Sequence, residues 1–318
     1  MTVDMHSHFF PGAAAGRGGP VVLGAVQDET VPLTAAGRTF HVPSALVDLE
    51  AQLAHRATCR VDAKVLQPPP FVVLYELPAA EGVRWSRRLN DAMAEAAAPH
   101  RGHLLPSATV PLQAGGAAAA SELARVHAKG MRHVQILSSV EGASIAAPPL
   151  EPFWAQAARL EFTVSIHPHF VSGAKRMQEF HLRNLIGNPT ETALAAAQLW
   201  ACGVLERHPN LDVVLAHGGG TFPHLLGRLT HGYQRRSEFA GVRLTPHQAA
   251  RRMRYDSLVF DPRILQHVSE LVGEDRLVPG TDFPFDMGDA APLDIFQQAG
   301  VGVPSTVTTT EESAWHYQ

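Results

Sequence analysis

The sequence predicts an α/β fold, a (β/α)8 TIM-like barrel. Short β-branched or apolar runs alternate with amphipathic stretches, as expected of repeated βα units around a parallel sheet. Polar side chains, several of them histidines, stand where these apolar runs end. The chain has 318 residues, a usual size for such a barrel. We therefore expect a single domain over residues 1–318.

Eight runs have the length and composition of buried strands. They end near His8, Gln67, Thr109, Leu137, His167, His217, Ser257 and Asp282. The stretches between and after them predict helices over 44–58, 85–98, 114–128, 150–159, 190–207, 221–236, 261–273 and 289–299. Two of these helices have readable starts: Thr190 is a candidate cap, and Asp261 precedes Pro262 at a first helical position.

Two long connections interrupt this alternation. Residues 9–43 and 168–189 are rich in Gly, Pro and Asn, and each follows a strand that ends in histidine. Barrel enzymes build their substrate sites from the loops that follow the strands. We interpret both segments as active-site loop insertions within one domain.

Composition excludes several classes of function. Hydrophobic residues make up 45% and charged residues 18% of the chain, as in a packed globular enzyme. A net charge of −4 gives no basic field for nucleic acid. Neither a basic, apolar leader nor a run long enough to span a bilayer is evident, and two cysteines make no disulfide framework. We expect a cytoplasmic protein with a small-molecule substrate and no nucleic-acid or membrane partner.

The pair His6 and His8 is the first chemical signal. Residues two apart on a strand project to the same side, so both imidazoles can share a metal, although an isolated pair can also be a surface feature. His167 and Asp282 end other strands, and the ends of barrel strands converge. Three imidazoles and a carboxylate suit one divalent metal, Zn²⁺ first, with Mn²⁺, Fe²⁺ or Co²⁺ also compatible.

His217 ends the sixth predicted strand, immediately before Gly218, Gly219 and Gly220. We assign it as a general base and acid beside the metal. The alternatives are a fourth imidazole ligand or a hydrogen bond to a neighbouring strand. The glycines predict a backbone that comes close to a substrate.

These residues, with the stretches HGGG at 217–220 and GTDFPF at 280–285, closely resemble the amidohydrolase superfamily, in particular its aminocarboxymuconate semialdehyde decarboxylase-like branch. The resemblance spans nearly the whole chain and implies a barrel of the metal-dependent hydrolase type. It implies that His6, His8, His167 and Asp282 bind one metal, usually zinc, and that His217 activates a metal-bound water. It also implies a homodimer. Other branches of the superfamily bind two metals that are bridged by a carboxylated lysine at the end of the fourth strand. The fourth predicted strand of this chain has no lysine at its end, so the resemblance implies a site for one metal.

The substrate positions depart from that branch. The semialdehyde decarboxylases resemble this chain around residues 40–44, but they carry a carboxylate-binding arginine at the position of Ser44 and a tryptophan at that of Asn184. Arg183, Arg56 or Arg228 could supply the missing cation. Phe170 and other loop aromatics are candidates for an apolar substrate pocket: Phe9, Phe71 and Tyr75.

The leading hypothesis is a metal-dependent, non-oxidative decarboxylase acting on an unsaturated or aromatic carboxylic acid, with His217 and Asp282 as the catalytic residues. The alternative is a hydrolase of an amide, lactone or C–C bond that uses the same site. The absent arginine favours hydrolysis or a substrate with a single carboxylate.

Overall fold

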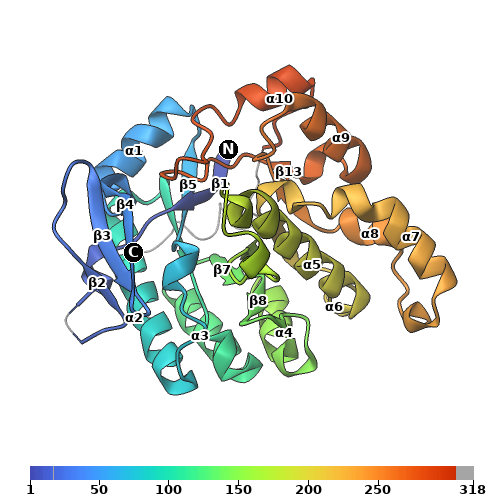
Figure 1. The fold of residues 1–318 in the computed structure, drawn as a ribbon, viewed down its shortest axis with the longest axis horizontal. Helices are drawn as coiled ribbons and strands as arrows, with labels where there is room; N and C mark the ends of the chain where they lie inside the picture. Colours follow the sequence, from blue (N-terminus) through green and yellow to red (C-terminus); the bar gives the residue numbers. More distant parts are fainter. Residues whose placement is uncertain (17, 306–318) are drawn as a thin grey trace.

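The computed structural model describes residues 1–16 and 18–305, so the last 13 residues of the expected domain and Arg17 lie outside the described part. Eight parallel strands form one sheet in the order β1-β5-β6-β7-β10-β11-β12-β13, which confirms the predicted barrel (Figure 1). Their bounds are Val3–His8, Ala63–Gln67, Leu104–Ala108, His133–Leu137, Thr163–His167, Asp212–Leu215, Arg254–Asp256 and Leu277–Val278.

The barrel closes between its last and first strands. The backbone N–H of Met5 donates to Pro279 O (2.8 Å), and that of His8 donates to Phe283 O (2.7 Å). A further bond runs from Asp282 N to His6 O at 2.8 Å. Because strand β13 is only two residues long, the segment that follows it completes the sheet. This closure places Asp282 beside β1.

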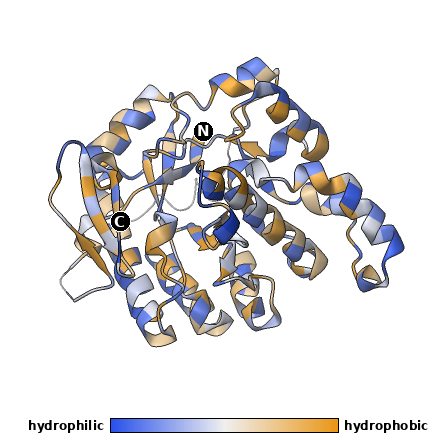
Figure 2. Cartoon of the chain, viewed as in Figure 1, coloured by the Kyte–Doolittle hydropathy of each residue, from blue (hydrophilic) through white to orange (hydrophobic). Residues whose placement is uncertain are grey.

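Helices cover the outside of the barrel (Figure 1). Each carries both hydrophobic and hydrophilic residues, so that one face can pack on the strands (Figure 2). Their bounds are Leu49–Thr58 (α1), Ala79–Ala97 (α2), Gly116–Ala128 (α3), Glu151–Arg159 (α4), Asn188–Ala201 (α5), Val204–Arg207 (α6), Leu226–Arg235 (α7), Pro246–Ala250 (α8), Pro262–Val272 (α9) and Asp294–Ala299 (α10).

The predicted helix over 190–207 differs from the observed structure at both ends. A π-helix, Arg183–Gly187, runs directly into α5, so Thr190 lies inside the helix and its hydroxyl donates to Ile186 O. The prediction of Thr190 as a cap is therefore wrong. Gly203, at φ 71°, separates α5 from α6. Its left-handed backbone, which glycine adopts at little cost, ends the longer helix.

Asp261 caps α9 as the sequence predicts, because its side chain accepts a hydrogen bond from Arg263 N at 2.9 Å. Replacing it with alanine leaves that N–H without its partner. We expect Asp261→Ala to lower the free energy of unfolding by about 1 kcal/mol, measured by urea denaturation. Asp275→Ala, an exposed carboxylate paired with Arg276, is the matched control and should cost less. Equal losses in the two variants would contradict the capping role.

Residues 9–43 are not irregular throughout. They contain a three-stranded antiparallel sheet of β2 (Val21–Leu23), β3 (Thr30–Ala35) and β4 (Arg38–Pro43). Side chains of β3 alternate between half-buried and buried, the period expected of a strand with one face on a core. Ala36 and Gly37, both at positive φ, form the two-residue turn between Ala35 and Arg38. The segment is thus an ordered insertion at the barrel rim.

Two barrel strands end two or more residues earlier than predicted. Strand β11 stops at Leu215 and β13 at Val278, so His217 and Asp282 lie on the segments that follow these strands. Both have positive φ, 57° and 53°. The two side chains meet at the barrel mouth, where His217 Nε2 lies 4.0 Å from Asp282 Oδ2. Within residues 1–16 and 18–305, no helix is both long and apolar enough to cross a membrane.

Candidate active site

Three imidazoles and one carboxylate converge at the carboxyl ends of the barrel strands. One ligand atom from each of His6, His8, His167 and Asp282 lies within 4.8 Å of all the others, and all four residues are buried. They come from β1, from β10 and from the segment after β13. Residues separated by more than a hundred positions in sequence therefore form one cluster.

The separations within the cluster fit a single metal ion. His6 Nε2 is 3.2 Å from His8 Nε2, and His8 Nε2 is 3.0 Å from the nearer Asp282 oxygen. His6 Nε2 is 3.5 Å from the same oxygen. Ligands about 2.1 Å from a tetrahedral metal stand roughly 3.4 Å apart. Three nitrogen donors and one oxygen donor at these separations suit a divalent cation of intermediate softness.

The imidazole rings are oriented by bonds on their other nitrogen. His6 Nδ1 is 2.6 Å from Asp256 Oδ2, and His167 Nδ1 donates to Pro168 O at 2.8 Å. Each bond leaves Nε2 free to face the cluster. A hydrogen bond of this kind fixes the tautomer that a metal needs.

Asp256, at the end of β12, is a site residue that the sequence reasoning missed. Its buried carboxylate contacts His6 and also accepts bonds from His217 N (2.9 Å) and Gly218 N (2.7 Å). One side chain thus ties a candidate ligand to the segment that carries His217. The signal was present in the sequence, because Asp256 is a polar residue at the end of the seventh apolar run.

Burial and nearby charges favour the protonation state that metal binding requires in three of the four donors, Asp282, His8 and His167. Burial raises the pKa of Asp282, but the bond from His8 and the charge of His6 outweigh it and lower the pKa to about 2. Burial also lowers the pKa of both His8 and His167. For His6, burial opposes ionisation, yet the bond to Asp256 and the nearby carboxylates raise the pKa to about 9. The carboxylates around His6 therefore favour a positive charge at this place, and His6 would release its proton when a metal binds.

His217 lies beside this cluster. Its Nε2 is 4.0 Å from Asp282 Oδ2, and its ring centre is 5.4 Å from those of His6 and His167. Burial, followed by the charge of His6, lowers the pKa of His217, so its imidazole is neutral near pH 7. A neutral imidazole next to a ligand carboxylate can accept and return a proton.

Packing within the chain also requires the three glycines after His217. A Cβ on Gly218 would lie 2.3 Å from Val259 Cγ1, and one on Gly220 would lie 1.9 Å from Pro189 O. Both residues also have φ near 60°. The glycines therefore allow the chain to pack against its own β12 segment and α5. This packing fixes the turn in which His217 stands.

The proposed substrate contacts lie on the segment after β10. Arg183 begins the π-helix and donates to His169 O at 3.3 Å, without a carboxylate partner within the described part of the chain. Asn184 follows it and is half-buried. Phe170 packs partly against the core and contacts the His169 ring edge-on. Within the described part of the chain, no hydrogen bond, ion pair or ring contact joins these three residues to the four candidate ligands.

Aromatic side chains extend from the cluster instead. The Phe285 ring is centred 5.2 Å from His8, and Phe71 lies 6.3 Å from Phe285. Phe40, on β4 of the inserted sheet, stacks on Phe71 at 4.5 Å. Phe71 was a candidate from the sequence, whereas Phe285 and Phe40 were not. This row gives the neighbourhood of His8 an apolar, aromatic wall.

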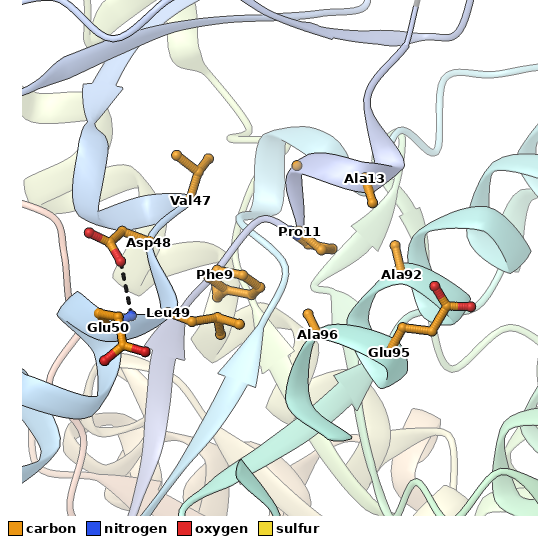
Figure 3. A pocket seen from close by; sticks show the side chains of 11 residues that line it. Phe9, Pro11, Ala13, Val47, Asp48, Leu49, Glu50, Ala92, Glu95 and Ala96 are labelled. Carbon is orange, nitrogen blue, oxygen red and sulfur yellow. Dashed lines mark hydrogen bonds between the residues drawn. The ribbon is translucent and has the colours of Figure 1, made fainter. Parts of the chain in front are cut away.

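A separate cleft of about 470 Å³ lies between the segment after β1, the start of α1 and α2 (Figure 3). Phe9 forms part of its wall, with Asp48 at one side and Glu95 at the other. The Asp48 carboxylate accepts bonds from Glu50 N and Ala51 N and so caps α1. None of the four candidate ligands lines this cleft.

Comparison with known proteins connects this site to a family. The profile of the amidohydrolase family matches residues 3–307. A 2-amino-3-carboxymuconate-6-semialdehyde decarboxylase from Dictyostelium discoideum is 30% identical over 92% of this chain and 84% of its own length. A gamma-resorcylate decarboxylase from a Rhizobium species is 30% identical over 66% of this chain and 69% of its own.

The fold is shared with solved structures. A dihydroxybenzoic acid decarboxylase from a Polaromonas species superposes with a TM-score of 0.76 over 95% of this chain and 91% of its own, at 20% identity. That structure contains manganese and the inhibitor 2-nitroresorcinol.

Proposed function

Because this chain belongs to the amidohydrolase family, we propose that it is a metal-dependent, non-oxidative decarboxylase of a small aromatic or unsaturated carboxylic acid. The observation that carries the proposal is the buried cluster of three imidazoles and one carboxylate at the barrel mouth. Both curated relatives described above are named as decarboxylases, which favours this reaction over hydrolysis at the same site.

His6, His8, His167 and Asp282 would hold one divalent metal. We propose zinc as the native ion, because imidazole and carboxylate donors suit it, while Mn²⁺, Fe²⁺ and Co²⁺ remain compatible with the same donors. When bound, the metal supplies a Lewis acid that stabilises negative charge on the substrate.

His217 is the proposed general base and acid of this reaction. The bond between the carbon skeleton and its carboxylate breaks, CO2 leaves, and the electron pair that stays on carbon takes up one proton. Asp282 is ionised and faces His8, so it is a poor proton source. His217 Nε2 lies next to it, and we assign to this atom the uptake of a proton from a water molecule and its delivery to carbon. The hydroxide left from that water combines with the released CO2 as bicarbonate, so the reaction balances.

Substrate binding divides between two regions. The aromatic wall of Phe285, Phe71 and Phe40 suits the face of a ring or conjugated chain near His8. Arg183 is available for an anionic substituent, with Asn184 and Phe170 beside it on the same segment. We keep these three as proposed contacts.

We further propose a homodimer and a cytoplasmic location. In support of the homodimer, Phe180, Leu185, Ile186 and Leu194 leave apolar surface exposed on one continuous segment, a feature of protein interfaces. In support of the location, Cys59 and Cys202 are free thiols.

The direct test combines metal analysis of the purified protein with headspace CO2 measurement over a panel of aromatic and muconate-type acids. We expect one metal per chain and CO2 release from at least one acid. Removal of the metal with a chelator should abolish this release, and added Zn²⁺ or Mn²⁺ should restore it. One metal per chain with no CO2 from any acid would favour the hydrolase alternative, and activity that survives complete metal removal would refute the proposal.

A further inference from the structure

Lys64 is a buried ammonium that the proposed chemistry does not use. It lies on β5, points toward α1 and has no exposed surface. Its Nζ donates to Gln52 Oε1 at 3.0 Å and lies 3.1 Å from His55 Nδ1. Burying a lysine costs free energy unless its charge is paired and its N–H groups are satisfied. A lysine in this place therefore requires an explanation.

The anionic partner of Lys64 is Asp4, which also bonds to the segments that carry candidate ligands. Lys64 Nζ is 3.8 Å from Asp4 Oδ2, and both side chains are fully buried. Asp4 accepts bonds from His6 N (3.1 Å), from Thr281 N (3.1 Å) and from Thr281 Oγ1 (2.6 Å). This carboxylate thus joins β1 to the residue immediately before Asp282.

The other neighbours of Lys64 reach the same two segments. Gln52 accepts a hydrogen bond from Lys64 Nζ through Oε1 and donates one through Nε2 to His8 O at 2.8 Å. Phe283, the residue after Asp282, places its ring centre 4.4 Å from Nζ. The His55 ring stacks on the Phe283 ring, with ring centres 3.8 Å apart. Lys64 is therefore one contact away from the backbone of His6 and His8 and from both neighbours of Asp282.

We propose that Lys64 is a positioning residue for the metal site, fixing the distance between β1 and the 281–283 segment through Asp4, Gln52 and Phe283. The inference rests on the metal site of the proposed function. Its physical reason is geometric: a metal site loses affinity when its ligands are not held in place by their own supporting contacts. Lys64 holds the two halves of this site together from the side that faces α1.

The test measures metal affinity in the full-length holoprotein by competition with a chromogenic chelator. Lys64→Met keeps the length and apolar stem of the side chain but removes the charge. We expect the dissociation constant for Zn²⁺ to rise by about 10- to 100-fold, the range found when supporting contacts of metal ligands are lost. Lys129→Met, which removes an exposed lysine paired with Asp91, is the matched control and should bind Zn²⁺ as the wild type does.

A second variant separates positioning from general stability. Thr281→Val removes the hydroxyl that donates to Asp4 at 2.6 Å, together with its longer bonds to His6 O and from Phe283 N, and it should also weaken Zn²⁺ binding. If Lys64 acts through Asp4 and Thr281, the two substitutions are not independent. The factor by which the double variant raises the dissociation constant for Zn²⁺ should then be smaller than the product of the factors for the two single variants. Wild-type affinity in Lys64→Met, with only the midpoint of unfolding lowered, would overturn the proposal. If Lys64→Met does not fold, wild-type affinity in Thr281→Val alone would overturn it.

Failure of the metal site itself has a different signature. If the wild-type protein binds no Zn²⁺ or Mn²⁺, the proposed function fails and the role of Lys64 fails with it. If the wild type binds one ion and Lys64→Met binds it equally well, only the role of Lys64 is refuted.

Discussion

Replacing His217 with alanine is expected to lower kcat for CO2 release by about 10²- to 10⁴-fold, the usual contribution of a general acid or base. Metal content should stay at the wild-type level, because the four ligand atoms that converge come from other residues. The physical reason is that the carbon which loses CO2 must receive a proton, and His217 Nε2 is the neutral imidazole beside Asp282.

The matched control for this variant is His231→Ala, which removes an exposed histidine of α7. It should keep both metal and turnover. Metal analysis and a progress curve of CO2 release on the same preparations check both values. A loss of the metal in His217→Ala would make His217 a fourth imidazole ligand, and unchanged kcat with full metal content would remove it from the mechanism.

Replacing Asp256 with asparagine should weaken metal binding by about 10- to 100-fold and lower turnover with it. The carboxylate orients His6 at 2.6 Å and accepts bonds from the backbone N–H groups of His217 and Gly218. Asparagine keeps the shape of the side chain, but it loses the negative charge that raises the pKa of His6. The dissociation constant for Zn²⁺, measured by chelator competition, is the primary readout.

Asp212→Asn provides the control for Asp256. Asp212 begins the adjacent strand β11 at the other end of the barrel, where it pairs with Arg254. Its loss should lower thermal stability and leave metal affinity unchanged. If the two variants bind Zn²⁺ equally well, Asp256 stabilises the fold without supporting the site.

The sequence predicted the fold closely because alternating apolar runs and amphipathic stretches are local patterns. All eight predicted strand positions correspond to barrel strands. The errors fall where tertiary contacts override local preference. Thr190 resembles a cap, yet a π-helix continues into α5 before it. The alternation in β3 was overlooked within a segment rich in turn residues.

The site was less completely predictable. The sequence singled out His6, His8, His167, His217 and Asp282 because each is a polar residue near the end of an apolar run. Asp256 follows the same rule, but Ser257 directly after it is also polar, so the end of the seventh run does not distinguish Asp256 from its neighbour. Lys64 follows no such rule, because it lies inside a strand between apolar neighbours. Its partner Asp4 and its contact Phe283 are far away in sequence.

By itself the sequence determined the architecture, the family and the residues able to bind a metal, because these depend on local periodicity and on residue type. Only the tertiary structure decided which other residues hold these candidate metal ligands in place. Asp256 meets both His6 and His217, and Lys64 meets Asp4 and Phe283, only after the barrel closes between β13 and β1. Contacts between distant strands depend on how the sheet closes, and no local pattern in the chain encodes that closure.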